Sequence, residues 1–276
     1  MGGVDLHTHT TASDGTYAPA ELVREAARRG VRVLAVTDHD SVDAVKPAIE
    51  AARRHAPLEI VPGIEINTDE PGGEVHVLGY FLDHEAGWLL DLLREFREER
   101  AARVHRIVER LAALGCPIDA EEVLALVAEG SAGRPHVAQV MVRRGYVGTV
   151  REAFDRFLAA GKPGYVPHRK VTPREACEII RRARGLAVVA HPGFHPDPEA
   201  MIRGIADAGL LDGVECYYAE HSPELTAQLL ALCRRLDLVP TGGSDFHGPR
   251  VRAATLGQPS VPWEAWDALR RRAGRG

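Results

Sequence analysis

Histidine and carboxylate residues recur at the ends of short apolar runs in this chain. His7 and His9 form an H-x-H pair directly after the first run, and Asp14 follows in a Ser-Asp-Gly turn. In a strand, residues two positions apart point to the same face, so both imidazoles can reach one metal ion. The pair alone is weak evidence for a metal site, because H-x-H also occurs by chance.

The same residue types follow the later apolar runs. They are His39, Glu65, His76, His191, Asp245 and His247. One histidine near a strand end is more often a capped or solvated side chain than a ligand, and Asp14-Gly15 alone fits a turn. Ligand-type residues at the same place in successive runs have no such simple explanation. The joint pattern predicts one metal centre formed by all nine: His7, His9, Asp14, His39, Glu65, His76, His191, Asp245 and His247.

The size of this set bears on the number of ions and on the substrate. A single catalytic zinc takes three protein ligands, so nine ligands indicate two or three divalent ions. Three ions outweigh the charge of the three carboxylates and one hydroxide, and residual positive charge suits a phosphate dianion. Clustered metals also suit attack of a metal-bound hydroxide on phosphorus. Glu65 is the best candidate to bridge two ions, because a carboxylate can offer one oxygen to each.

The elements that carry these residues alternate along the chain. Strands are expected at Val4–Leu6, Val31–Thr37, Glu59–Glu65, Val75–Phe81, Leu186–Ala190, Gly213–Cys216 and Leu238–Thr241, with a further one near Ala254–Leu256. Helices are expected at Pro19–Arg29, Val42–His55, Pro173–Arg184, Pro198–Ala208, Pro223–Leu236 and Trp263–Arg272, with Thr172, Asp197 and Ser222 as N-caps. This α/β alternation predicts a parallel sheet, and about seven such units favour a closed or nearly closed barrel. The carboxyl ends of barrel strands converge on one face, where the nine residues would meet.

Residues from about 85 to 160 interrupt the alternation. A long helix is expected at Glu85–Leu114, ended by Gly115, and shorter ones at Ala120–Ala128, Pro135–Arg144 and Val150–Ala159. We therefore expect an all-helical insertion, residues 85–167, that forms a substrate cap. Residues 1–84 and 168–276 would form the two parts of the barrel.

Composition excludes several classes of protein. The 276 residues carry a formal net charge of −5, which argues against binding to nucleic acid by bulk charge. No apolar run reaches the roughly 18 residues that a membrane span needs, and no signal peptide is visible. We therefore expect a cytoplasmic protein that does not bind membranes. No stable protein partner is indicated.

The motifs around the nine residues resemble those of the PHP (polymerase and histidinol phosphatase) superfamily. They are Asp5-Leu6-His7-Thr8-His9-Thr10, Thr37-Asp38-His39-Asp40, Gly63-Ile64-Glu65-Ile66, Ala190-His191-Pro192-Gly193 and Gly243-Ser244-Asp245-Phe246-His247. The resemblance implies a distorted seven-stranded β/α barrel with two or three metal ions. It assigns His7, His9, Glu65 and Asp245 to the first ion, Asp14, His39 and His247 to the second, and Glu65, His76 and His191 to the third. Manganese is the expected ion, with iron or zinc as alternatives.

The insertion narrows the resemblance to one branch. Three of its segments look like motifs of the TrpH-like metal-dependent phosphoesterases. They are Arg97-Glu98-Glu99-Arg100-Ala101, Gly133-Arg134-Pro135-His136-Val137-Ala138 and Gly161-Lys162-Pro163-Gly164-Tyr165-Val166-Pro167. This branch contains nucleoside 3′,5′-bisphosphate phosphatases and 5′-to-3′ exoribonucleases. The expected activity is hydrolysis of a 3′,5′-bisphosphate to the 5′-nucleotide and phosphate, of short 5′-phosphorylated RNA, or of both. Histidinol phosphate phosphatase, or another small-molecule phosphatase of the superfamily, is the alternative.

Five residues of the insertion are candidates for binding a second phosphate: Arg97, Arg100, Arg134, His136 and Lys162. Arg97 and Arg100 share a helix face, and arginine suits bidentate phosphate contacts, although a solvated, salt-bridged face fits the same spacing. Arg134 and His136 open a helix, whose N–H groups attract anions. Lys162 lies in a Gly/Pro-rich loop that could reach the pocket.

Two other classes of protein remain open. Amidohydrolase-type metal enzymes also begin with H-x-H, but many use a carboxylated lysine after strand four, and none of the three lysines here ends a core strand. A non-catalytic module that regulates a partner, such as a polymerase, is disfavoured by the complete ligand set. Tyr217, Tyr218 and His221 follow the sixth strand, where they could wall the pocket, stack on a base or form an ordinary loop.

Overall fold

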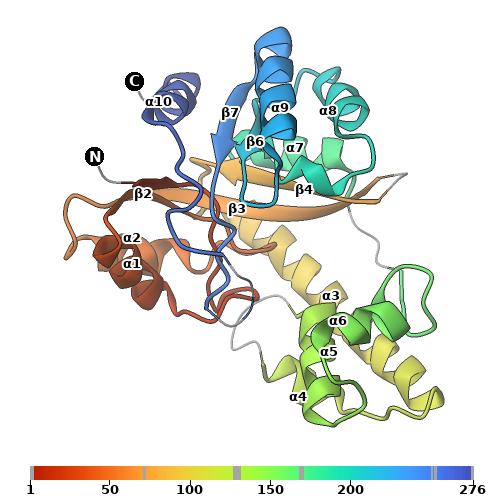
Figure 1. Ribbon diagram of the computed structural model, residues 1–276. Coiled ribbons are helices and arrows are strands. Elements are labelled where there is room, and N and C mark those ends of the chain that lie inside the picture. The colour runs from red at the N-terminus through yellow and green to blue at the C-terminus, as the bar shows by residue number, and fades with distance from the viewer. Residues whose placement is uncertain are drawn as a thin grey trace.

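The computed structural model describes residues 3–70, 73–126, 132–167, 171–249, 251 and 254–274. Its centre is one seven-stranded sheet in which the strands lie in chain order. The strands are β1 (Gly3–Asp5), β2 (Val31–Val36), β3 (Glu59–Glu70), β4 (Gly73–Tyr80), β5 (Leu186–Val189), β6 (Gly213–Tyr217) and β7 (Val239–Gly242). Helices surround this sheet, and a separate group of helices lies beside it (Figure 1).

Strand β4 departs from the predicted parallel order. It runs antiparallel to both β3 and β5, whereas the other neighbouring strands are parallel. Glu70 pairs with Gly73, so only two residues separate β3 from β4, and a parallel connection needs a dozen or more. The reversal places the first half of β4 beside the last half of β3, where Asn67 pairs with His76. His76 therefore lies at the same edge as the residues that end the parallel strands.

Backbone hydrogen bonds connect the first and last strands just beyond their ends. Leu6 N donates to Gly242 O over 3.2 Å, and Asp245 N donates to His7 O over 2.8 Å. These bonds close the sheet on the side where the predicted ligands lie. The distorted seven-stranded barrel that the sequence predicts is thereby confirmed, with β4 reversed.

Six α-helices pack around the barrel. They are α1 (Pro19–Arg28), α2 (Val45–Ala52), α7 (Pro173–Arg182), α8 (Pro198–Ala206), α9 (Pro223–Leu236) and α10 (Trp263–Arg272). The predicted N-caps are confirmed, because the side chains of Thr172, Asp197 and Ser222 each accept a hydrogen bond from a backbone N–H of the first turn. A short 3₁₀ turn, η2 (Pro192–Phe194), follows β5. Large apolar side chains such as Trp266, Tyr80 and Ile64 are fully buried between these layers.

The chain between β4 and β5 is helical, as expected. It contains α3 (Gly87–Ala113), α4 (Ala120–Leu124), α5 (Arg134–Arg143), α6 (Val150–Ala153) and a π-helical turn, η1 (Phe154–Leu158). Gly115 follows α3 with φ +80°, a backbone conformation that ends helices and favours glycine. Ile107, Leu111, Val137 and Met141 share a core of their own. This separate core supports the proposal that residues 85–167 form a distinct cap.

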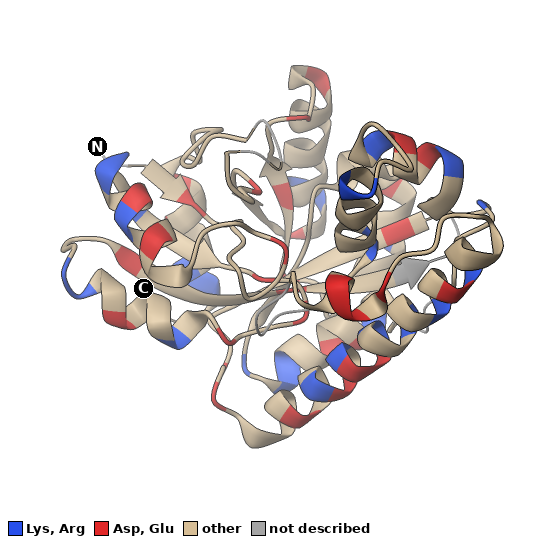
Figure 2. Cartoon of the chain, turned by 90° about the horizontal axis from the view of Figure 1, so that it is seen from below, with Lys and Arg blue, Asp and Glu red and all other residues tan. Residues whose placement is uncertain are grey.

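Helix α3 is the longest helix, with 27 residues. It carries charged residues of both signs. Figure 2 shows basic and acidic residues, in blue and red, interspersed over the helices of the chain. Within the described part of the chain, no helix combines the length and apolar character needed to cross a membrane.

A few predicted elements differ from the structure. Residues 254–256 form no strand. Helix α2 is shorter than predicted, because residues 43–44 form a turn and the helix runs only from Val45 to Ala52. The helix expected at 120–128 ends at Leu124, and positions 127 and 128 lie outside the described residues. The helix expected at 150–159 changes to π-helical geometry at Phe154.

Gly243 packs so closely against His7 that a side chain has no room there. A Cβ atom at this position would lie 2.4 Å from the backbone nitrogen of His7. We expect Gly243→Ala to displace the segment that carries His7 and His9, and to cost about 1–3 kcal/mol of stability, as overpacking does. Thermal unfolding and the metal content of the purified protein measure the effect.

Gly204→Ala is the matched control, because Gly204 lies within α8 and a Cβ atom there meets nothing within 4 Å. Alanine favours the helix, so the midpoint of unfolding should stay the same or rise slightly. A Gly243→Ala protein with native midpoint and native metal content would contradict the close packing.

Candidate metal centre

The nine predicted ligands come together at the closed end of the barrel. His7 and His9 follow β1, His39 follows β2, and Glu65 and His76 lie within the β3–β4 hairpin. His191 follows β5, and Asp245 and His247 follow β7. All nine are buried or half-buried. The antiparallel hairpin explains why two of these residues lie inside strands instead of after them.

Glu65 occupies the centre of the cluster and has no exposed surface. Its two oxygens face five imidazoles. The contacts are 3.1 Å from Oε2 to nitrogens of His7, His9 and His39, and 2.9 Å and 3.1 Å from Oε1 to nitrogens of His76 and His191. Because each oxygen faces a different set of imidazoles, this carboxylate has the geometry expected of a bridging ligand.

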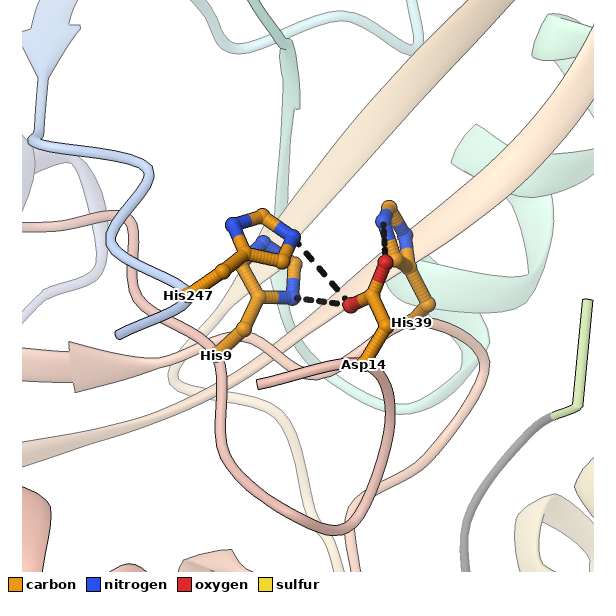
Figure 3. A group of neighbouring side chains, drawn as sticks. All are labelled: His9, Asp14, His39 and His247. Atoms are coloured by element: carbon orange, nitrogen blue, oxygen red, sulfur yellow. Dashed lines mark ion pairs between the residues drawn. The ribbon is translucent and has the colours of Figure 1, made fainter. Parts of the chain in front are cut away.

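Two further carboxylates complete the cluster. Asp245 Oδ1 lies 3.4 Å from His7 Nε2 and 3.2 Å from His9 Nε2. Asp14 faces three imidazoles from a loop, as Figure 3 shows. Its contacts are 3.1 Å to His247 Nε2, 3.8 Å to His9 Nδ1 and 3.9 Å to His39 Nε2. His9 thus lies between the two carboxylates.

The donor atoms form three groups that could each hold an ion, with all atoms of a group within 4.8 Å of one another. The groups are His7, His9, Glu65 and Asp245; His9, Asp14, His39 and His247; and His39, Glu65 and His76. Two buried atoms, His9 Nε2 and Asp14 Oδ1, have no partner with hydrogen-bond geometry among the described residues, although charged atoms lie 3.1–3.2 Å from each. Imidazole and carboxylate donors with unpartnered atoms between them fit bound divalent metal ions.

These groups are similar to the three ligand sets that the family resemblance implies, with two differences. His9 also belongs to the group around Asp14, and His39 takes the place of His191 beside His76. His191 remains in contact with the cluster through Glu65 Oε1.

Burial and charge act in opposite directions on the ionisation of these groups. Burial alone would raise the pKa of Glu65, but the imidazoles of His39 and His7 hold it well below its usual range. Burial alone would lower the pKa of His9, but its contacts with Asp245 and Glu65 raise it to about 10. At His39 burial outweighs the neighbouring carboxylates and lowers the pKa to about 3. The central carboxylate is therefore ionised at neutral pH, as a metal ligand must be.

Glu215 supports the cluster and was missed by the sequence prediction. It lies on β6 with no exposed surface. Its Oε1 lies 2.9 Å from His7 Nδ1, and its Oε2 accepts a 2.7 Å hydrogen bond from the backbone N–H of His191. A carboxylate only accepts, so His7 donates from Nδ1 to Glu215, which leaves Nε2 as the nitrogen that faces Glu65 and could bind an ion. The sequence offered one indication of this role, because Glu215 is a charged residue inside a predicted apolar strand.

Tyr218 and His221 lie beside the cluster at this end of the barrel. The Tyr218 hydroxyl donates a 2.9 Å hydrogen bond to Asp245 Oδ2. His221 Nε2 accepts a 3.2 Å hydrogen bond from the backbone N–H of Gly193. Neither residue lines the two cavities that border the cluster, and both contact loops that carry candidate ligands.

A cavity of about 200 Å³ extends from the cluster to the helices beside the barrel. One wall contains Asp14, His39, Asn67, Glu74 and His76, and the other contains Arg100, Arg103, Arg134, His136 and Phe154. Arg100 pairs with Asp40, and Arg134 Nη2 lies 2.5 Å from Glu74 Oε1. The cavity therefore joins the candidate metal ligands to three guanidinium groups.

Arg103 is a cation of this cavity that the sequence prediction missed. It is 7% exposed, and its Nε donates to Val166 O over 2.9 Å. Its Nη2 is buried and has no hydrogen-bond partner among the described residues. Burial and the nearby charge of Arg134 lower its pKa to about 10, so it is still cationic at neutral pH. A buried, unpartnered N–H group of a cation is suited to an anionic ligand.

The other predicted phosphate-binding residues lie in different places. His136 lines the cavity, and its Nδ1 accepts a 3.2 Å hydrogen bond from Gly133 N. Burial lowers the pKa of His136. Arg97 lies 3.2 Å from Asp43 Oδ2 and does not line the cavity. Lys162 is exposed and does not line it either.

Known proteins resemble this chain in sequence and in fold. Residues 5–94 match the PHP domain. The 5′-3′ exoribonuclease Rnm of Escherichia coli is 36% identical over 249 residues, which cover 89% of this chain and 85% of that protein. A 3′,5′-nucleoside bisphosphate phosphatase of Chromobacterium violaceum is 31% identical over 99% of this chain and 98% of its own.

A solved structure shares the architecture. A protein from Bifidobacterium adolescentis, described as a metal-dependent phosphoesterase, superposes with a TM-score of 0.87 and 31% identity over 98% of this chain and 96% of its own. Similarity of this degree extends over the barrel and the helical insertion together. The chain therefore belongs to the PHP-domain family of metal-dependent phosphoesterases, as its motifs predict.

Proposed function

We propose that this protein hydrolyses phosphate esters that carry a second phosphate, namely nucleoside 3′,5′-bisphosphates and short 5′-phosphorylated RNA. The observation that carries the proposal is the shared cavity. Asp14, His39 and His76 line it beside the cluster, and Arg100, Arg103 and Arg134 line it at the other wall. One wall suits the reacting phosphate, and the other suits a phosphate that does not react.

The nine clustered residues would hold two or three divalent ions, with manganese as the expected metal and iron or zinc as alternatives. When bound, such ions supply an activated water molecule and offset the charge of the reacting phosphate. Glu65 would bridge ions, since its oxygens belong to two of the three groups of donor atoms. Glu215 would hold His7 in the tautomer that presents Nε2 to an ion.

The helical insertion would bind the remote phosphate and so position the scissile bond. Asp40 and Glu74 hold the guanidinium groups of Arg100 and Arg134 at the cavity. Arg103 lines the same cavity and offers an N–H group that has no partner among the described residues. Binding energy from a phosphate that does not react can be used to orient the one that does.

The reaction adds water across the bond between phosphorus and the 3′-oxygen. The water oxygen goes to phosphorus, and the 3′-oxygen leaves as a hydroxyl group. A bisphosphate then gives a 5′-nucleotide and inorganic phosphate, and RNA gives a 5′-nucleotide and a shortened chain with a new 5′-phosphate. A substrate with a single phosphate, such as histidinol phosphate, would leave the arginine wall without an anion, which disfavours that alternative.

Removal of metal should abolish hydrolysis and lower stability. Protein purified without chelator should contain more than one divalent ion per chain by elemental analysis. Treatment with chelator should lower the midpoint of thermal unfolding, because the ions offset repulsion among buried carboxylates and stabilise the folded state. Addition of Mn²⁺ should restore both the hydrolytic activity and the midpoint of unfolding. Activity with one ion or fewer, unchanged by Mn²⁺, would contradict a multinuclear centre.

Glu65→Gln should lose bound metal and nearly all activity. The amide has one oxygen that can bind a metal and no charge, so it cannot bridge two ions. Metal content and kcat with a 3′,5′-bisphosphate measure the effect. Glu59→Gln, at the exposed start of the same strand, is the matched control and should behave as the native protein. Near-native turnover of Glu65→Gln would refute the bridging role.

Loss of a guanidinium group from the cavity should reduce activity only where a second phosphate is present. We expect Arg100→Ala and Arg134→Ala to lower kcat/KM for a 3′,5′-bisphosphate by about one to two orders of magnitude, as loss of a charge-assisted contact does. With p-nitrophenyl phosphate, which has no second phosphate, the loss should be small.

Arg97→Ala is the control, since Arg97 lies one turn before Arg100 on α3 and faces Asp43. This variant should keep native activity with both the 3′,5′-bisphosphate and p-nitrophenyl phosphate. If Arg100→Ala and Arg134→Ala lower both activities equally, these arginines serve the metal centre or the fold, and the two-phosphate explanation of specificity is wrong.

A further inference from the structure

A second cavity, of about 310 Å³, also borders the metal centre. Its wall contains Glu74, Val75, His76, Ala190, His191, Pro192, Phe194, His195 and Met201. It shares Glu74 and His76 with the arginine-lined cavity, so the two meet at the cluster. Of the residues that the structure describes, no arginine or lysine lines the second cavity, and most of that wall is apolar. Its chemistry suits an uncharged, flat group and not another phosphate.

Phe194 is the unusual residue of this cavity. Its side chain is 56% exposed, and among the large apolar side chains that the described residues expose it is the only aromatic one. The ring lies 5.3 Å from the ring of His191, centre to centre, and meets the ring of Tyr218 edge to face at 5.8 Å. An exposed aromatic ring directly beside a candidate metal ligand is placed to contact the substrate.

The turn that carries Phe194 is held in position before any ligand binds. His195 N donates to Pro192 O over 3.0 Å, which closes the 3₁₀ turn. A Cβ atom at Gly193 would lie 2.7 Å from the ring of His221, so the turn packs tightly on that imidazole. The ring is therefore presented by a fixed backbone, which reduces the entropic cost of stacking on it.

We propose that this cavity binds the second nucleotide of an RNA chain, with its base stacked on Phe194. The inference rests on the proposed function. If the 5′-phosphate binds at the arginines and the scissile phosphate at the cluster, the chain beyond that phosphate must continue from the cluster. The second cavity borders the cluster through His76 and His191, and its aromatic wall suits a base of any sequence. A nucleoside bisphosphate has no atoms to place there, so this subsite serves RNA alone.

Three substrates with the same first nucleotide test the proposal. They are a nucleoside 3′,5′-bisphosphate, a 5′-phosphorylated dinucleotide, and the same dinucleotide without the second base. The native protein should cleave the complete dinucleotide with a kcat/KM about tenfold above that of the baseless one, since stacking on an aromatic ring favours the base. Phe194→Ala should bring this ratio close to one, and should lower kcat/KM for the complete dinucleotide far more than for the bisphosphate.

Leu114→Ala is the matched control, because Leu114 is also an exposed apolar residue and lies at the end of α3. It should leave all three activities and the ratio unchanged. Isothermal titration with a dinucleotide that carries an uncleavable methylene linkage gives a second readout. Phe194→Ala should bind it about tenfold more weakly, again by loss of stacking.

Equal cleavage of the two dinucleotides by the native protein would overturn the subsite. Equal losses on the dinucleotide and the bisphosphate in Phe194→Ala would also overturn it, because the ring would then contact the first nucleotide. Failure of the proposed function looks different, since the native protein would then cleave none of the three substrates.

Discussion

The buried carboxylate of Glu65 is the constraint on which the rest of the barrel depends. An ionised group without exposed surface is tolerated only where positive charge and hydrogen bonds compensate it. Here five imidazoles surround the carboxylate and compensate its charge. They come from β4 and from the segments after β1, β2 and β5. The closure of the sheet between Leu6 and Gly242, and the reversal of β4, are what bring these segments within reach of one side chain.

The barrel and the helical insertion contribute different parts of one cavity. The barrel supplies imidazoles and carboxylates from strand ends, where backbone hydrogen bonds fix their positions. The insertion supplies Arg100, Arg103 and Arg134 from two helices that pack on their own apolar core. Changes in those helices can alter which anion is bound without moving the candidate metal ligands. The chemistry of the centre and the choice of substrate can therefore vary independently.

The sequence was informative where the signal was local. The nine candidate ligands, the N-caps at Thr172, Asp197 and Ser222, and the barrel class could be predicted from residue types beside short apolar runs, and the structure brings eight of the nine into groups that could hold an ion. The direction of β4 was not predicted, because an apolar run looks the same in either direction. The sequence could not show that Arg97 and Arg100 have different surroundings. Only the position of α3 against the barrel turns Arg100 to the cavity and Arg97 to Asp43. Arg103 and Glu215 were missed because their roles depend on contacts distant in sequence.

Buried carboxylates that are not among the nine ligands hold the ligand-bearing loops. Asp5 accepts hydrogen bonds from Ser244 N over 2.8 Å and from Gly257 N over 2.7 Å, although burial raises its pKa. Asp38 accepts from Thr10 N over 2.7 Å. Together with Glu215, these groups connect the loops after β1, β5 and β7 by bonds to backbone N–H groups that would otherwise be unpaired in a buried site. The loop geometry is therefore set by the chain itself, and bound ions would meet donors already in place, which reduces the entropy lost when the centre forms.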